Sequence, residues 1–274
     1  MFSQVNRKKI KYIKHKIIYL VTHSTKSKEK YKKAKMWLKT YYNFKNSFSK
    51  NTFFVIGDSH TDIFSSNQFE KKILLGFKEL KSNLWGSVYS APEFVTYHLD
   101  ACLAYNINKT NTTMKGHEKV DYLIKNKYLP KGCKVITSFG EIDCRVHIKK
   151  QAEKQNKTID DVIDDVIEQY GNFLISLQNK GYNVIAYAPI ASQKENIDID
   201  PMFPRYGNEI ERNKISLRFG NKLQMFCNKN KIKFISLLND LVNNDLTTKS
   251  EFYRDGVHLN MDARPIIIEK VKRL

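Results

Sequence analysis

The sequence of 274 residues predicts an α/β fold in which helices cover both faces of a central parallel sheet. From residue 52 onward, short apolar runs typical of buried strands alternate with longer stretches that have helical periodicity. This alternation continues to the end of the sequence without an internal repeat or a low-complexity linker. The hydrophobic fraction of 41% and the aromatic fraction of 12% indicate a packed core, not a chain that is disordered overall.

About five strands are expected, each formed by an apolar run rich in β-branched and aromatic residues. These runs are residues 52–56, 84–89, 134–139, 183–188 and 233–237. Helical patterns are expected at residues 68–80, 93–104, 116–126, 159–178, 208–228 and 261–273. Loops that follow parallel strands open at one edge of the sheet, so motifs in these loops are expected to converge there.

The positive charge of the chain is concentrated near its N-terminus. The formal net charge is +19, and residues 1–50 contribute +14, because fourteen lysines and Arg7 face only one acid, Glu29. The remaining 224 residues carry only +5. We therefore expect a basic N-terminal extension, residues 1–50, followed by an α/β domain, residues 51–274.

The basic extension mixes lysine with apolar and aromatic residues, and residues 28–42 have the pattern of a helix. Such a surface attracts anionic lipid headgroups or an acidic polysaccharide. Nucleic acid is not an expected partner, because no known nucleic-acid-binding module accompanies the charge. The alternative is a solvated arm, since lysine is abundant throughout the chain.

No apolar run approaches the ~20 residues of a membrane span. Residues 17–21 are too few for the apolar region of a signal peptide. The expected location is therefore the cytoplasm, at the inner face of the membrane if the extension binds lipid. The four cysteines agree with this, because Cys102, Cys133, Cys144 and Cys227 are widely spaced and contain no C-x-x-C pair. We expect reduced and mostly buried thiols and no metal site.

The first motif is T-F-F-V-I-G-D-S-H-T-D-I-F at residues 52–64. A strand-like run ends at Gly57, which allows a sharp turn, and Ser59 or Thr61 could cap a following helix. The Ser59 hydroxyl is thereby expected at the carboxyl end of a strand, beside the partly positive start of a helix. Ser59 is either a nucleophile or a helix cap. For Asp58, a hydrogen bond to the turn backbone is preferred over a chemical role.

The second motif is F-Y-R-D-G-V-H-L at residues 252–259. Asp255 precedes His258 by three residues across a glycine, so its carboxylate can fold back and orient the imidazole. The two motifs together supply Ser, Asp and His in chain order.

These residues carry a resemblance to a known family. Gly57-Asp58-Ser59 and the late Asp255-Gly-Val-His258 resemble the SGNH hydrolase superfamily, also called GDSL. His60 after the serine is closer to members that acetylate or deacetylate glycans. The resemblance implies a flavodoxin-like strand order. It also implies Ser59 as nucleophile, His258 as general base and Asp255 as the residue that orients it.

The third block departs from the family pattern. The family has Gly-x-Asn-Asp, with the Asn helping to bind the oxyanion, whereas F-G-E-I-D-C-R-V-H at residues 139–147 contains Gly140 but puts Ile142 at the Asn position. Arg145 or His147 could substitute for the Asn. The family's glycine block is assigned to Gly86, although residues 92–96 could equally occupy that loop.

Four further residues have alternative interpretations. Arg145 either binds an acyl oxygen or a sugar carboxylate, or pairs structurally with Glu141 or Asp143. Arg212 or Asn213 could reach the acceptor side of the site. Cys144 is assigned to packing in preference to a position that lines the site.

The resemblance implies serine-dependent O-acyl transfer on a carbohydrate, by an O-acetyltransferase or O-acetyl esterase of a surface glycan or its precursor, either acidic or lipid-linked. No cofactor is required, and a transferase would use a soluble donor such as acetyl-CoA. The alternative is a glycan-binding or scaffold relative without catalysis. Ile142 favours this alternative, whereas the intact Ser59, Asp255 and His258 oppose it.

Overall fold

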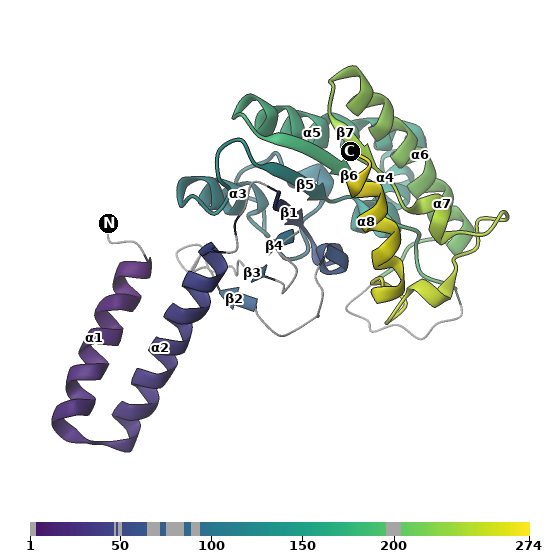
Figure 1. Cartoon of the computed structure of the whole chain (residues 1–274). Helices are drawn as coiled ribbons and strands as arrows, with labels where there is room; N and C mark the ends of the chain where they lie inside the picture. Colours follow the sequence, from purple (N-terminus) through teal and green to yellow (C-terminus); the bar gives the residue numbers. More distant parts are fainter. Residues whose placement is uncertain are drawn as a thin grey trace.

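A computed structural model describes residues 4–46, 48, 51–64, 72–74, 85–88, 94–195 and 204–274. Two helices, α1 (Gln4–Thr22) and α2 (Thr25–Asn46), form a hairpin that projects away from the α/β part of the chain (Figure 1). The predicted helix at residues 28–42 is confirmed as the middle of α2. None of the helices in the described ranges has an apolar stretch long enough to cross a bilayer.

Within the described residues, one sheet contains seven strands in the order β2-β3-β4-β1-β5-β6-β7. They are β1 (Phe53–Gly57), β2 (Lys72–Leu74), β3 (Trp85–Val88), β4 (Phe94–His98), β5 (Lys134–Ser138), β6 (Asn183–Tyr187) and β7 (Lys233–Ile235). The last five in the sheet order are parallel, whereas β2 and β3 add an antiparallel pair at one edge. The parallel strands have the flavodoxin-like order 2-1-3-4-5, which confirms the predicted fold.

Helices cover both faces of the sheet (Figure 1). They are α3 (Gly116–Lys125), α4 (Ile148–Gln155), α5 (Ile159–Asn179), α6 (Glu209–Lys229), α7 (Leu238–Leu241) and α8 (Arg264–Lys272). Side chains alternate across a strand, so Phe54 packs in the cluster that contains α5 and α6, whereas Val55 packs in the cluster that contains α7 and α8. This produces three layers with a core on each side of the sheet.

Several predicted elements near the start of the domain are wrong. The stretch predicted as a helix at residues 93–104 contains β4, the second parallel strand. The run predicted as that strand, residues 84–89, contains the antiparallel edge strand β3. Within the predicted helix at residues 68–80, the described residues 72–74 form β2, and the rest lies outside the described residues. The other predicted strands and helices agree with the structure within about two residues.

The four cysteines are free, and Cys102, Cys144 and Cys227 are buried. Cys144 packs in the core cluster on the α5 and α6 side of the sheet, which agrees with the packing interpretation. Burial raises the pKa of all four thiols, to about 12 for Cys102. The thiols are therefore protonated and unreactive near neutral pH.

Candidate active site

Gly57 allows the end of β1 to approach β5 closely. A Cβ atom at this position would lie 2.2 Å from the carbonyl oxygen of Ser138, which no side chain tolerates. The next amide, that of Asp58, donates to the same carbonyl at 3.3 Å. The turn η1 (Ser59–Phe64) then begins at once, which places Ser59 at the carboxyl end of β1 as predicted.

Asp58 holds this turn together. Its Oδ1 accepts a hydrogen bond from the His60 amide at 2.9 Å, which confirms the expected contact with the turn backbone. The Thr61 hydroxyl donates to the Asp58 carbonyl at 2.8 Å, so it does not act as the helix cap that the sequence suggested. Burial raises the pKa of Asp58 to about 7.

The structure brings Ser59, His258 and Asp255 into one hydrogen-bonded chain. The His258 Nε2 lies 2.8 Å from the Ser59 Oγ, and the His258 Nδ1 lies 2.8 Å from the Asp255 Oδ2. An ionised carboxylate only accepts, so Nδ1 carries the proton and Nε2 accepts from the serine hydroxyl. Asp255 also accepts from the Val257 and His258 amides through Oδ1, at 3.0 and 2.7 Å, which closes the predicted tight turn.

The environment of this chain keeps His258 neutral and Asp255 charged. Burial lowers the pKa of His258, and Asp255 opposes that effect only in part. For Asp255, burial acts to raise the pKa, but hydrogen bonds from His258 outweigh it and hold the pKa well below its usual range. Arg254 joins the two segments, because its guanidinium contacts Asp255 at 3.1 Å and Asp62 of η1 at 3.3 Å.

A second buried network lies beside the first. The His60 Nε2 bonds Glu141 Oε2 at 2.9 Å, and the Arg145 Nε donates to Glu141 Oε1 at 2.7 Å. Burial would raise the pKa of Glu141, but Arg145 and His60 outweigh burial and lower it to about 2. Arg145 also donates to the carbonyl of Pro204. Of the two alternatives for Arg145, the structure contains the structural pair, and Glu141 is the partner.

Asp143 has a separate role in the same block. Its carboxylate accepts from the amides of Ala104 at 2.8 Å and Tyr105 at 3.3 Å, and burial raises its pKa to about 6. It thereby ties η3 (Ala104–Asn106) to the π-helical turn η4 (Asp143–His147). Both turns form walls of a pocket.

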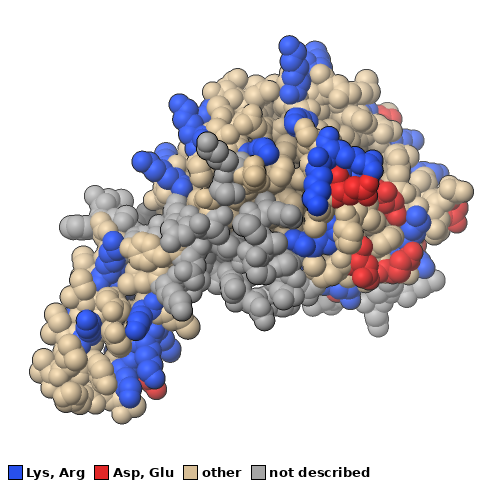
Figure 2. All heavy atoms as spheres, viewed as in Figure 1, with Lys and Arg blue, Asp and Glu red and all other residues tan. Residues whose placement is uncertain are grey.

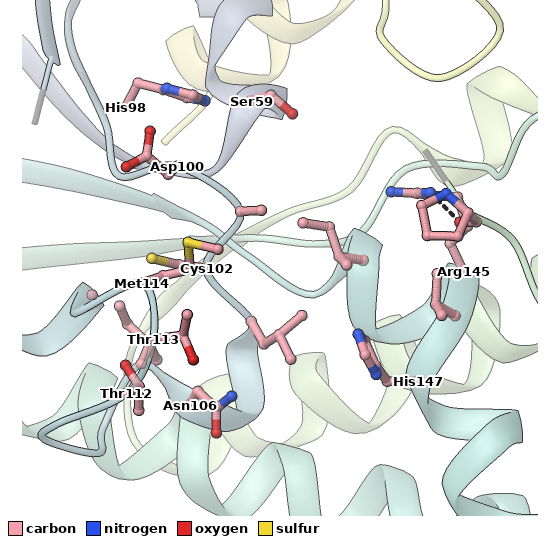
Figure 3. A pocket seen from close by; sticks show the side chains of 17 residues that line it. Ser59, His98, Asp100, Cys102, Asn106, Thr112, Thr113, Met114, Arg145 and His147 are labelled. Atoms are coloured by element: carbon pink, nitrogen blue, oxygen red, sulfur yellow. Dashed lines mark hydrogen bonds between the residues drawn. The ribbon is translucent and has the colours of Figure 1, made fainter. Parts of the chain in front are cut away.

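The pocket has a volume of about 570 Å³ and opens beside Ser59 (Figure 3). Its lining comes from η1, the loop after β4, the stretch from Leu103 to Gly116, and η4. Figure 3 shows Ser59, His98 and Asp100 on one side and Arg145 and His147 on another. Burial lowers the pKa of His147, so a neutral imidazole faces the cavity near pH 7.

The loop after β4 is the part of the site that the sequence did not reveal. Asp100 adopts a positive φ of 62° there, and its carboxylate accepts from the Lys119 ammonium at 2.7 Å. Lys119 is fully buried and also donates to the Leu99 carbonyl, so α3 fixes this loop against the pocket. The loop could have been located from the aromatic and β-branched run F-V-T-Y-H, which is typical of a strand and ends just before it as β4.

Two predicted glycines do not line the pocket. Gly86 is paired with Ile73 and Tyr97 within the antiparallel edge strand β3, so its assignment to the glycine block is wrong. Gly140 has a φ of 107°, and its Cα lies between Phe219 and Pro189, where a Cβ would come within 3.1 Å of each. Gly140 therefore shapes the turn behind the site. Ile142, at the family's Asn position, does line the pocket.

Arg212 and Asn213 are also placed elsewhere. Both are fully buried, and neither lines the pocket, so the suggested contact with an acceptor is wrong. The Arg212 guanidinium donates to the Ser192 hydroxyl and the Gln193 carbonyl, whereas Asn213 bonds the backbone of Ser192 and Leu246. These hydrogen bonds fix two connecting segments to α6: the one that follows β6, at Ser192 and Gln193, and the one at Leu246.

Among the residues that the structure describes, no group of three or more His, Cys, Asp or Glu side chains is arranged to hold a metal ion.

No family model matches this sequence, and no curated protein matches it either. Solved structures do match. A protein from Streptococcus pneumonia described as a platelet activating factor has a TM-score of 0.53 and 13% identity, covering 87% of this chain and 90% of its own. A GDSL-like lipase from Bacteroides thetaiotaomicron has a TM-score of 0.51 and 11% identity, covering 86% and 95%.

An acetylxylan esterase from Geobacillus stearothermophilus also matches, with a TM-score of 0.46, 14% identity and a coverage of 82% and 94%. At these identities the likeness concerns the fold, and the first two structures carry it. Together with the flavodoxin-like strand order and the Gly-Asp-Ser turn at the end of β1, it shows that this chain has the fold of the SGNH (GDSL) hydrolases.

Proposed function

We propose that the protein is a serine-dependent O-acyl esterase or O-acyltransferase that acts on a carbohydrate. The observation that carries this proposal is the continuous chain of two 2.8 Å hydrogen bonds from Ser59 through His258 to Asp255. Such a chain activates a serine hydroxyl, because the imidazole can take its proton while the carboxylate stabilises the resulting cation. In this proposal, Ser59 is the nucleophile, His258 is the general base and Asp255 orients it.

The reaction proceeds through an acyl-enzyme. The Ser59 Oγ attacks the acyl carbonyl carbon as its proton moves to the His258 Nε2, and a tetrahedral oxyanion forms. When the oxyanion collapses, the bond between the acyl carbon and the leaving group breaks, and His258 returns the proton to that group. The leaving group is the alcohol of an ester substrate, or the thiol of CoA when acetyl-CoA is the donor. Water or a sugar hydroxyl then attacks the acyl-enzyme, and His258 accepts and returns a proton in the same manner. In this second attack an esterase passes the acyl group to water, whereas a transferase passes it to the sugar hydroxyl.

The oxyanion needs hydrogen-bond donors near Ser59. The Ser59 amide is the first of η1, where the geometry of a helical turn provides no acceptor. The amide of Ala101 is the second candidate, since Ala101 lines the pocket in the loop that Lys119 fixes. In the described part of the chain, neither amide has a hydrogen-bond acceptor. These backbone donors would take over part of the role of the Asn that Ile142 replaces.

The pocket suits a substrate larger than an acetyl group alone. Its volume of about 570 Å³ is within the range of small-molecule sites and is lined by both apolar and hydrogen-bonding side chains. Four polar side chains of the lining can form hydrogen bonds with sugar hydroxyls: those of Asn106, Thr112, Thr113 and His147. The lining also offers apolar surface, from Ile107 and Met114. A surface glycan or its precursor is the substrate class that we propose, and acetyl-CoA is the soluble donor that a transferase would use.

Labelling with a fluorophosphonate probe tests the proposal. We expect the wild-type protein to be labelled covalently and S59A to remain unlabelled. S176A is the matched control, because Ser176 lies on α5 outside the pocket and its hydroxyl donates to the Phe173 carbonyl of the same helix, and it should be labelled like the wild type. Equal labelling of the wild type and S59A would refute the nucleophile assignment. Hydrolysis of p-nitrophenyl acetate with and without an oligosaccharide acceptor then separates an esterase from a transferase.

The second candidate function is a glycan-binding protein that has lost efficient catalysis. Ile142 favours it, because losing one oxyanion donor typically costs ~10²-fold to 10³-fold in rate. A protein of this kind would bind acetylated oligosaccharides without labelling at Ser59. A covalent adduct at Ser59 together with turnover of the acetate ester would exclude it.

A further inference from the structure

Helix α1 presents two different faces. On one face, Tyr12 and Tyr19 pack on Tyr31 of α2, with ring centroids 5.2 and 6.1 Å apart. On another face, large apolar side chains remain 53% to 76% exposed. These residues, called the α1 stripe below, are Ile10, Ile13, Ile17, Leu20 and Val21. Their spacing of three or four residues puts them along one side of the helix, so the stripe is a continuous apolar surface.

Basic side chains border the α1 stripe on both sides. At 100° per residue, Arg7 and Lys14 fall along one edge of the stripe, and Lys9 and Lys16 fall along the other. All four are exposed. Helix α1 contains no acid, and Glu29 is the single acid between residues 4 and 46, against fourteen lysines and arginines. Figure 2 shows Lys and Arg side chains along the hairpin.

An apolar stripe bordered by basic side chains indicates what kind of partner covers the stripe. A second copy of the hairpin would bring two rows of lysines together as it covered the stripe, and this like-charge contact is unfavourable. An anionic bilayer surface instead provides negative headgroups at the level of the lysines and acyl chains below them. Lysine side chains can place their ammonium groups among the headgroups while their methylene stems cover apolar surface.

We propose that α1 binds anionic membranes, lying in the plane of the interface with the α1 stripe inserted among the acyl chains. The hairpin projects away from the α/β domain, and α1 is the helix farther from it (Figure 1). The domain therefore leaves α1 accessible to a flat surface. Charge draws the hairpin to the membrane, and burial of the apolar stripe holds it there. This proposal is independent of the chemistry at Ser59.

Cosedimentation of the full-length protein with vesicles tests the proposal. The probes are vesicles of phosphatidylcholine alone and of phosphatidylcholine mixed with phosphatidylglycerol. We expect wild-type protein to bind only the mixed vesicles. The double variant I13Q/I17Q keeps every charge and has good helix formers at both positions, so it should retain the hairpin. Its partition coefficient for mixed vesicles should fall about tenfold or more, because two side chains no longer enter the acyl region.

M225Q is the matched control, since Met225 is a 71% exposed apolar residue on α6, outside the hairpin. It should bind like the wild type. Helical content by circular dichroism and gel-filtration volume should be the same for all three proteins. Wild-type binding by I13Q/I17Q would overturn the proposal, because charge alone would then suffice. A wild-type dimer that I13Q/I17Q dissociates, without vesicle binding, would overturn it in favour of a second copy.

Discussion

The imidazole ring of His60 lies 5.2 Å from the ring of His258, measured between ring centroids, with the two planes inclined by 32°. Burial acts to lower the pKa of His60, but the Glu141 and Asp58 carboxylates together outweigh burial, and the pKa is raised. A positive charge on His60 disfavours protonation of His258. It therefore adds to the effect of burial, the larger cause of the lowered pKa of His258. The neighbouring histidine thus helps to keep the proposed base neutral.

This relationship predicts the pH profile. In the wild type, the acid limb of kcat/KM for p-nitrophenyl acetate should have its midpoint below 6.5, the ordinary pKa of imidazole. In H60Q, the positive charge is lost while an amide donor for Glu141 remains. The pKa of His258 should therefore rise, and the acid limb should move to higher pH.

H117Q is the control for this shift, because His117 lies on α3 and contacts Asp121, away from Ser59, His258 and Asp255. Its profile should overlay that of the wild type. An acid limb in H60Q that stays in place, or moves to lower pH, would show that His60 is not a cation that acts on His258.

Ile142 provides the second prediction. It is half-buried, lines the pocket and stands where the related family has an oxyanion-binding Asn. I142N would introduce a side-chain amide that can donate to the oxyanion, and a donor of this kind is typically worth ~10² to 10³ in rate. We expect kcat for p-nitrophenyl acetate to rise at least about tenfold in I142N. I142L keeps an apolar side chain of the same volume and should show no increase. A kcat unchanged in I142N would indicate that backbone amides already complete the oxyanion site.

The two segments that carry the proposed chemistry could be predicted because each is a local pattern. The turn at Gly57 and the Asp255-to-His258 turn involve residues within a few positions of one another, and parallel strands lead both to the same edge of the sheet. Strand β4 could not be predicted in this way. Phe94, Val95 and Tyr97 are buried on both faces of the sheet, so the run shows no alternation and resembles a buried helix segment.

The misassignment of β4 bears on Gly86 as well. Because β4, and not the run at residues 84–89, is the parallel neighbour of β1, the loop that lines the pocket beside Ser59 follows β4 and contains Asp100, whereas Gly86 lies within the edge strand β3. The buried network around Glu141 could not be predicted from the sequence for a different reason. His60 and Glu141 are 81 positions apart, and nothing in the sequence around either residue identifies the other as its partner. Only tertiary packing brings these charges together.

Glu141 carries the third prediction, which concerns stability. E141Q leaves the Arg145 guanidinium buried without a carboxylate, and removing one partner of a buried pair typically costs ~3 kcal/mol or more. Urea denaturation at neutral pH should show a loss of about this size. The folded pKa of about 2 lies below the ordinary value of 4.5. The stabilisation by Glu141 is therefore fully present above 4.5 and lost as the pH falls through about 2.

E141Q should consequently lose less stability than the wild type over that acidic range, because a glutamine does not titrate. D165N is the control, since the ion pair between Asp165 and Lys157 is solvent-exposed. Its unfolding midpoint should equal that of the wild type. A midpoint for E141Q equal to that of D165N would mean that the buried network contributes nothing to stability.

Gly57 provides the last prediction. In G57A, the new methyl group would lie 2.2 Å from the Ser138 carbonyl oxygen and 2.8 Å from its Cβ. The first of these is a backbone atom, so β1 and β5 must separate, and Ser59 moves with the end of β1. We expect a loss of at least ~2 kcal/mol in the free energy of unfolding. G220A is the matched substitution, because Gly220 lies within α6 and its nearest neighbour, the Ala188 Cβ, would be 3.9 Å away. There, alanine should stabilise the protein by up to ~1 kcal/mol. Urea denaturation of both variants measures the contrast, and a G57A protein as stable as the wild type would show that β1 can end in this position without a glycine.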